Sequence, residues 1–210
     1  MTSTSAAIGN DLIASRGHRW YRIPMQSLQI YKAYRARILV LLMGAGSLIV
    51  GVGCSSVGSG ERATAELKDK DGKSVGVASF TEAGSGVRVR LEVKGLSAGL
   101  HAVHIHAVGK CETPGFTSAG GHFNPAQKKH GYKSPDGAHA GDLPNMLVAK
   151  DGSGRFEALT DAVTLRSGSS SVFDADGSAL VVHVGVDDHV TDPTGNAGDR
   201  AACGVITARN

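Results

Sequence analysis

Histidine is the residue type that could do chemistry in this sequence, and most of the nine histidines gather in short motifs from residue 101 onward. In chain order these are His101, His104, His106, His122, His130, His139 and His183. A carboxylate, Asp142, closely follows His139. Neutral imidazole is the commonest protein ligand for zinc and copper. The number and type of these side chains therefore predict a metal site.

The first three histidines lie within residues 99–106, where Val103 and Ile105 favour a strand. Side chains alternate between the two faces of a strand, so His104 and His106 are expected to project together. His101 is out of phase with that pair. We therefore predict that His104 and His106 are ligands and that His101 is structural.

The next three histidines belong to residues 111–145, a stretch punctuated by glycine, proline and lysine that shows neither a helical nor a strand period. We predict a long loop, and loops of this length in a compact domain are commonly functional. His122, His130, His139 and Asp142 provide three imidazoles and one carboxylate, the number and types that suit a closed zinc site. Such a metal would order the loop.

Five motifs together carry a specific resemblance. They are Gly-x-His-x-x-His-x-His from Gly99, Gly-His-Phe-Asn-Pro at 121–125, His-Ala-Gly-Asp at 139–142, Leu-Val-Val-His at 180–183, and Thr-Gly-Asn-Ala-Gly-Asp-Arg-Ala-Ala-Cys-Gly-Val-Ile at 194–206. In order and spacing they resemble the copper/zinc superoxide dismutase family, over about residues 64–208. A longer segment between Cys111 and His122 is similar to the bacterial branch of that family.

The resemblance implies a role for each matched residue. It implies copper ligands at His104, His106, His122 and His183, and zinc ligands at His122, His130, His139 and Asp142. His122 would then bridge the two metals, and Asp187 would link a copper ligand to a zinc ligand. Cys111 and Cys203 match the family's intradomain disulfide, and His101 matches a structural histidine.

The implied activity is conversion of superoxide to oxygen and hydrogen peroxide through Cu(II)/Cu(I) cycling, beside a structural zinc. Zinc has no redox chemistry, so copper must be the electron-transfer centre. A bridging imidazole such as His122 can supply a proton. Arg200 matches the arginine beside the open copper position, where a permanent cation attracts and orients the anion. The segment between His183 and Arg200 has no lysine. Further steering charges are expected elsewhere, with Lys110, Lys128, Lys129 and Lys133 as candidates.

Three other functions explain the sequence less well. A non-enzymatic copper or zinc carrier needs neither a bridging histidine nor a steering arginine, so His122 and Arg200 argue against it. A copper-only dismutase would lack His130, His139 and Asp142, which are present. A structural envelope lipoprotein with a dead site does not explain the complete ligand set.

The elements that position these residues are predicted to be all-β. Strands are expected at residues 62–68, 73–80, 86–94, 145–150 and 154–159, with Asp-Lys-Asp-Gly at 69–72 as a hairpin turn. Residues 86–94 alternate strictly between polar and apolar. Short strands with many glycines indicate a sandwich or a barrel. The resemblance narrows this to a Greek-key β-barrel, related to immunoglobulin-like sandwiches, with two long functional loops.

The N-terminal part is predicted to be a targeting segment. A thirteen-residue apolar run at 38–50 follows Lys32, Arg35 and Arg37, as in a signal peptide, and is too short to span a membrane comfortably. It ends before Cys54 and a flexible Ser/Gly stretch, which resembles a bacterial lipoprotein signal, although Gly51 replaces the usual leucine. Lipidation of Cys54 would anchor the protein to the outer face of a membrane. Ordinary secretion, with Cys54 removed or left as a free thiol, is the alternative.

The domain boundaries follow from this interpretation. Residues 1–24 are expected to be a gene-model extension, with translation starting at Met25. Residues 25–53 form the signal peptide, 54–61 a flexible tether, and 62–210 the dismutase domain. A peptide from the unprocessed precursor that spans Arg22 to Met25 would exclude the later start.

Charge gives no support for nucleic-acid binding. Six of the 22 basic residues but one of the 19 acidic ones precede Cys54, so the remaining part carries 16 basic and 18 acidic residues, a net charge of −2. The basic character of the whole chain therefore belongs to the targeting segment. The sequence leaves the oligomeric state open between monomer and dimer.

Overall fold

The structure is a computed structural model that describes residues 14–16, 19–21 and 61–209. By their contacts the residues form two units, Met1–Ser55 and Ser56–Asn210. In the first unit, β1 (Ala14–Arg16) and β2 (Arg19–Tyr21) pair antiparallel. Met25, the apolar run at 38–50 and Cys54 lie outside the described residues. Within the described part of the chain, no helix has the length and hydropathy needed to cross a membrane.

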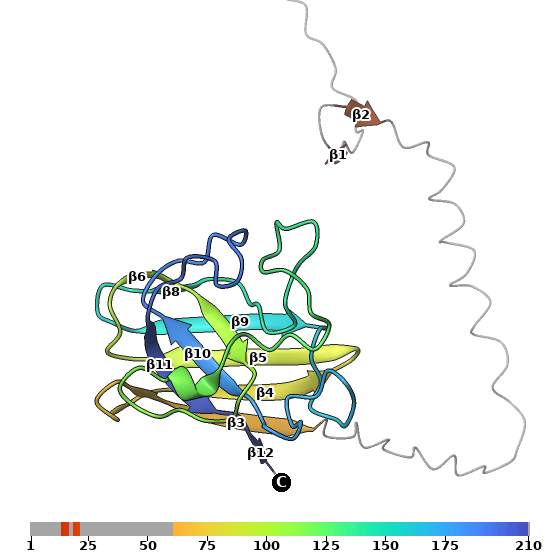
Figure 1. The fold of residues 1–210 in the computed structure, drawn as a ribbon. Coiled ribbons are helices and arrows are strands. Elements are labelled where there is room, and N and C mark those ends of the chain that lie inside the picture. The colour runs from red at the N-terminus through yellow and green to blue at the C-terminus, as the bar shows by residue number, and fades with distance from the viewer. Residues whose placement is uncertain (1–13, 17–18, 22–60, 210) are drawn as a thin grey trace, which may run out of the picture. The chain divides into compact units, whose positions relative to one another are not determined.

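The second unit holds the predicted β-barrel (Figure 1). Its elements are β3 (Arg62–Asp69), β4 (Ser74–Ala83), β5 (Gly86–Val93), β6 (Gly99–His101), β7 (Val103–His106), the 3-10 helix η1 (Thr117–Ala119), β8 (Met146–Val148), β9 (Gly154–Thr160), β10 (Ala179–His183), β11 (Arg200–Val205) and β12 (Thr207–Arg209). The five predicted strands all form, with ends shifted by a few residues. The sequence analysis missed η1, which is too short to show a period.

The strand order closes the sheet almost completely. Nine strands pair antiparallel in the order β6-β8-β9-β5-β4-β3-β11-β10-β7, and a tenth, β12, pairs with β3. β6 and β7 lie at opposite ends of this order, yet only Ala102 separates them in the chain. The two ends of the sheet must therefore meet, which produces a barrel and confirms the predicted all-β class.

The alternation of β5 shows why these residues form a barrel wall. Val87, Val89, Leu91 and Val93 are buried in the core, whereas the intervening polar side chains are exposed. A side-chain period of two buries one face of a strand and leaves the other in water. The turn at 69–72 joins β3 and β4 as predicted, with Gly72 N–H donating to Asp69 O at 2.9 Å.

β10 differs because both of its faces are buried. Leu180 and Val182 point into the main core, whereas Ala179 and Val181 join a smaller cluster with Phe116 and Cys203. The disulfide between Cys111 and Cys203, predicted from the family resemblance, is present and closes a separation of 92 residues. It ties the segment 107–121, which carries η1, to β11.

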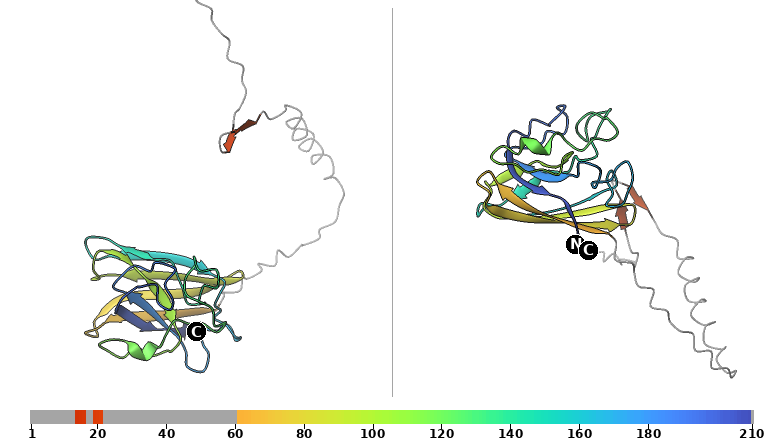
Figure 2. Two further views of the ribbon diagram at one scale, coloured as in Figure 1. Left: turned by 45° about the horizontal axis from the view of Figure 1, so that its top comes forward. Right: turned by 60° about the horizontal axis from the view of Figure 1, so that its bottom comes forward.

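Two long connections leave the barrel on the same side. The long loop 107–145, green in its later part, and the segment 184–199, dark blue, protrude together in Figure 1 and in the right view of Figure 2. They contact each other directly, since Lys133 N–H donates to His189 O at 3.0 Å. A third long connection, residues 161–178, joins β9 to β10 and was not assigned a function from sequence.

Candidate metal centre

β7 and β10 supply three of the predicted ligand side chains. His104 and His106 project from the same face of β7, and Ile105 turns into the hydrophobic core, as the strand period predicts. β10 pairs with β7, and His183 ends β10 opposite Arg200 of β11. A register shift between Val182 and His183 interrupts this ladder. Such an irregularity re-aims a side chain at a barrel rim.

The long loop delivers the other side chains by pairing its backbone with β7. Ile105 N–H donates to Gly141 O and Phe123 N–H donates to Ile105 O, both at 2.8 Å. Bridges then place His122 beside His106, and Asp142 beside His104. A Cβ atom at Gly141 would lie 2.1 Å from Ile105 O, so only glycine allows this approach. The Gly in His-Ala-Gly-Asp is thus a packing requirement.

The first group of convergent atoms comes from His104, His106, His122 and His183, all buried, with ligand atoms within 4.8 Å of one another. Backbone carbonyls fix two of these rings. His106 Nδ1 lies 2.9 Å from Gly120 O, and His183 Nδ1 lies 3.0 Å from Gly198 O. The Nε2 atoms of both rings consequently face each other at 3.4 Å. These contacts leave Nε2 as the metal-facing atom of both histidines.

The second group comes from His122, His130, His139 and Asp142, which are also buried. Asp142 Oδ1 lies 2.9 Å from His122 Nδ1, 3.1 Å from His130 Nδ1 and 3.4 Å from His139 Nδ1. Asp142 Oδ2 accepts the backbone N–H of Gly131 at 2.9 Å and of His139 at 3.0 Å. The loop backbone therefore holds the carboxylate while three imidazole nitrogens converge on its other oxygen. His122 belongs to both groups.

Unpartnered buried atoms test whether the groups fit metal ions. His104 Nδ1, His122 Nε2 and His130 Nδ1 are buried without a hydrogen-bond partner among the described residues. Buried polar atoms in proteins nearly always have a partner, so such exceptions require an explanation. All three atoms point into the two groups, where a metal ion would satisfy them. Four imidazoles suit copper, and three imidazoles with a carboxylate suit zinc, so both groups fit.

Asp187 links the two groups. Its Oδ2 lies 2.8 Å from His104 Nε2, and its Oδ1 lies 2.9 Å from His130 Nε2. Because an ionised carboxylate only accepts hydrogen bonds, both histidines must carry their proton on Nε2. Their Nδ1 atoms are then free to bind metal. Burial alone would raise the pKa of Asp187, but the hydrogen bonds from His104 and His130 lower it well below its usual range.

Four of the imidazoles are held neutral, the form that binds metal. Burial lowers the pKa of His104 to about 3, of His106 to about 2 and of His183 to about 4. Burial also lowers the pKa of His139. Burial opposes ionisation of Asp142, yet hydrogen bonds from His122 and the Gly131 N–H lower the pKa of that carboxyl to about 2. Three imidazoles of the first group and the carboxylate of the second are therefore ready to bind metal at neutral pH.

A cavity of about 420 Å³ gives access to the first group. Its lining consists of His106, Gly121, His122, Asn124, His139, His183, Pro193, Thr194, Gly198 and Arg200. Arg200 is partly buried and donates from Nη1 to Phe116 O and from Nη2 to Gly120 O, the latter at 2.5 Å. A larger hollow of about 630 Å³ shares Gly198 and Arg200 with this cavity as lining residues. It contains no imidazole, so we do not place the chemistry there.

Other predicted residues lie outside this centre. His101 is buried, and its ring nitrogens lie 2.6 Å from His183 O and 2.8 Å from Ser97 O, which is the predicted structural role. Two of the candidate steering lysines are engaged, Lys129 with Asp192 at 3.2 Å and Lys133 with Asp188 O at 3.2 Å. Lys110 and Lys128 are exposed.

Apart from Asp187, sequence reasoning missed the groups that orient the ligands and that carboxylate. The carbonyls of Gly120 and Gly198 and the side chain of Asn145 all serve this purpose. A carbonyl leaves no trace in a residue pattern. For Gly120, the available sequence signal was the glycine pair that precedes His122. For Asn145, it was the position only three residues after Asp142.

Comparison with known proteins identifies the family. Residues 74–206 match the family model of copper/zinc superoxide dismutase (SODC). The chain is 48% identical over 147 residues to superoxide dismutase [Cu-Zn] 2 of Aquifex aeolicus, covering 69% of this chain and 86% of the relative. Its identity to superoxide dismutase [Cu-Zn] of Caulobacter vibrioides is also 48%, with 69% and 84% covered.

A solved structure agrees with this result. The crystal structure of a SOD-like protein from Bacillus subtilis superposes with a TM-score of 0.66 at 35% identity, covering 69% of this chain and 97% of that one. The match to the family model, these relatives and the fold agree with the histidine geometry described above. The chain belongs to the copper/zinc superoxide dismutase family.

Proposed function

We propose that this protein converts superoxide to oxygen and hydrogen peroxide with bound copper and zinc. One observation carries the proposal: two buried groups of ligand atoms share His122, and one of them borders a cavity that also holds Arg200. A carrier would need the ligands alone. Turnover of a small anion also needs a cation that attracts it to an open ligand group, and a shared imidazole that can supply a proton.

We assign copper to His104, His106, His122 and His183, and zinc to His122, His130, His139 and Asp142. The assignment is supported by chemistry and access. A carboxylate with three imidazoles completes a four-coordinate zinc site. Four imidazoles suit copper, and His106, His122 and His183 of that group line the cavity through which substrate could enter.

When bound, copper supplies a one-electron couple that oxidises one superoxide to oxygen and reduces another, and zinc supplies a fixed charge on the bridging ring. The protein's own residues do the remaining work. Arg200 attracts the anion, and because Phe116 O and Gly120 O hold its guanidinium, the cation is already in place. His122 Nε2 is the atom that can hold a proton at the cavity and pass it to the reduced oxygen. Two protons enter for each hydrogen peroxide formed.

Metal content and activity, measured together on the purified protein, test this proposal. We expect one copper and one zinc per chain and a catalysed decay of superoxide. A matched control is His101→Gln, because His101 is buried beside His183 but belongs to neither ligand group. Zinc in both sites after copper loading, with no catalysed decay, would contradict the proposal.

We also propose that the protein is exported and anchored by a lipid on Cys54, where it would protect the cell envelope from extracellular superoxide. Support comes from the sequence: a basic segment, the apolar run at 38–50 and small residues before Cys54. Cys54→Ser should release the protein from membranes while its activity is retained. A variant that stays with the membrane fraction would exclude the lipid anchor.

A further inference from the structure

His189 is a histidine that belongs to neither ligand group, although it lies close to both. It stands two residues after Asp187, its side chain is 18% exposed, and its backbone is left-handed with φ 59°. Its backbone N–H donates to Asp187 Oδ1 at 2.7 Å. Its backbone is therefore tied to the carboxylate that links the two ligand groups.

The ring nitrogen Nδ1 of His189 lacks a hydrogen-bond partner among the described residues. Three other imidazole nitrogens share this property, but they point into the ligand groups. His189 Nδ1 instead lies 3.3 Å from Asp187 Oδ2, a contact outside hydrogen-bond geometry. A small movement of either side chain would complete this hydrogen bond to a carboxylate, which is among the stronger kinds.

Asn145 determines which ring nitrogen of His189 carries the proton. Asp187 N–H donates to Asn145 Oδ1 at 2.9 Å, which fixes the orientation of the amide. Asn145 Nδ2 then donates to Asp187 O at 2.9 Å and lies 3.2 Å from His189 Nε2. Because an amide nitrogen only donates, Nε2 must accept. The proton of a neutral His189 therefore resides on Nδ1, facing Asp187.

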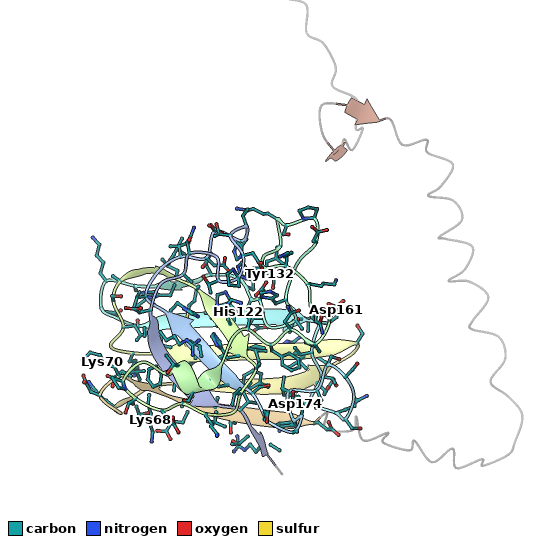
Figure 3. All side chains as sticks on the ribbon, viewed as in Figure 1. Lys68, Lys70, His122, Tyr132, Asp161 and Asp174 are labelled. Atoms are coloured by element: carbon teal, nitrogen blue, oxygen red, sulfur yellow. A yellow bond between two sulfur atoms is a disulfide. The ribbon has the colours of Figure 1, made fainter. Side chains whose placement is uncertain are left out.

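The long loop 107–145 packs over the ring of His189. The rings of Tyr132 and His189 have centroids 5.5 Å apart, and a Cβ atom at Gly131 would lie 2.2 Å from the carbonyl carbon of His189. Figure 3 shows Tyr132 in the protruding loops and His122 between these loops and the sheet. His189 thus occupies the crossing point of the long loop and the segment 184–199.

We propose that His189 is a positioning residue, whose Nδ1–H holds the Asp187 carboxylate in the orientation that aims His104 and His130 at their metals. Each oxygen of Asp187 then has two donors, one from a ligand histidine and one from His189. This inference rests on the proposed function because it assumes that both ligand groups hold metal. It adds His189 and Asn145 to Asp187 as residues that hold the metal ligands in place.

Two substitutions separate the hydrogen bond from simple packing. His189→Gly suits the left-handed backbone and keeps the backbone N–H but removes the ring. His189→Asn also tolerates that backbone and restores a side-chain N–H near the position of Nδ1. Zinc and copper release to a chelator are measured on metal-loaded protein at neutral pH, together with the electron paramagnetic resonance spectrum of copper. Urea unfolding of the metal-free variants corrects for altered stability.

We expect His189→Gly to release zinc about tenfold faster and to change the copper spectrum, since partners that orient metal ligands typically contribute such factors. His189→Asn should stay within about threefold of the native rate. A native rate of metal release from His189→Gly would overturn the proposal. Equally fast release from both variants would also overturn it, because that result would assign the effect to the ring. Metal release is measured without superoxide, so a protein that binds both metals but lacks activity would refute the proposed function alone.

Nitrogen-15 resonances of the histidine rings provide a second test that needs no variant. With zinc and reduced copper bound, the protein is diamagnetic, and the tautomer of His189 can be read from these resonances. A proton on Nδ1 supports the proposal. A proton on Nε2 would overturn it, whatever the variants show.

Discussion

Arg200 and His106 are joined through one atom, the carbonyl oxygen of Gly120. It accepts a hydrogen bond from Arg200 Nη2 at 2.5 Å and lies 2.9 Å from His106 Nδ1. The same carbonyl therefore fixes the cation at the cavity and the ring of a histidine of the first ligand group. Because the Cys111–Cys203 disulfide ties the segment that carries Gly120 to β11, where Arg200 begins the strand, both contacts depend on one piece of backbone.

Substitution of Arg200 should separate its charge from its geometry. Arg200→Ala is expected to lower the rate of superoxide decay about tenfold or more at low ionic strength, since a positive site speeds the arrival of an anion. Arg200→Lys keeps the charge but cannot donate to both Phe116 O and Gly120 O in a planar fork, so an intermediate rate is expected. The measurement is the decay rate against ionic strength, with metal content checked in each variant.

Arg155→Ala serves as the matched control for this charge. Arg155 lies on β9 with a side chain 87% exposed, and its removal subtracts the same charge from a residue that belongs to neither ligand group and does not line the cavity. It should leave the rate at low ionic strength nearly unchanged. If Arg155→Ala slows the reaction as much as Arg200→Ala does, a local steering role for Arg200 is wrong.

Removal of the disulfide should lower the free energy of unfolding more than it lowers metal content. In the chain-entropy account, a cross-link between residues 92 apart contributes about 4–5 kcal/mol to the free energy of unfolding. The double variant Cys111→Ser/Cys203→Ser is therefore expected to unfold at a much lower urea concentration. It should also weaken the contacts of Arg200 with Phe116 and Gly120, so activity should fall in a folded sample with both metals bound. Unchanged urea unfolding of the metal-free protein would contradict the stability argument.

The sequence predicted the barrel wall and the ligand side chains well because both depend on residue type and period. The alternation at 86–93 predicted β5, and the i, i+2 spacing of His104 and His106 predicted their common face. The register shift before His183 and the shared role of Gly120 O were not predictable. They depend on how the backbones of separate segments meet, β10 with β11 and Gly120 with Arg200 80 residues later, which no local pattern records.

His189 is a second residue whose role depends on tertiary structure. It is not among the ligands predicted from sequence, and the structure places it in neither ligand group. Its contact with Asp187 depends on a left-handed backbone at position 189 and on Asn145 arriving from 44 residues away. Both features arise from tertiary structure, so a pattern of residue types could show the histidine but not its role.

Loss of one second-group histidine should loosen the loop more than the barrel. His139 contributes its Nδ1 to that group, and the loop 107–145 contains only η1 as regular structure. We expect His139→Ala to increase hydrogen exchange in residues 111–145 and to lower zinc content, while copper binding is largely retained. Hydrogen exchange followed by mass spectrometry measures this. Exchange that rises equally in β7 and β10 would instead indicate damage to the whole barrel.

Acid should destabilise the metal-free protein through its buried imidazoles. Burial lowers the pKa of His104 to about 3, of His106 to about 2 and of His183 to about 4, each from an ordinary value of 6.5. Below pH 6.5 the unfolded chain binds protons that the folded protein does not, so stability is present above that pH and falls as the pH decreases toward 4. Each histidine contributes a slope of up to about 1.4 kcal/mol per pH unit in this window.

Urea unfolding of the metal-free protein between pH 7.5 and 4.5 measures that slope. His106→Gln removes one of the three titrating rings, so its unfolding free energy should depend less steeply on pH than that of the native chain. Asp142, whose pKa is lowered to about 2 from 3.8, contributes only below about pH 4 and cannot account for a loss at pH 6 to 5. A native free energy of unfolding that stays flat between pH 6.5 and 4.5 would mean that the rings become protonated in the folded protein. The neutral, metal-ready state of His104, His106 and His183 would then be wrong.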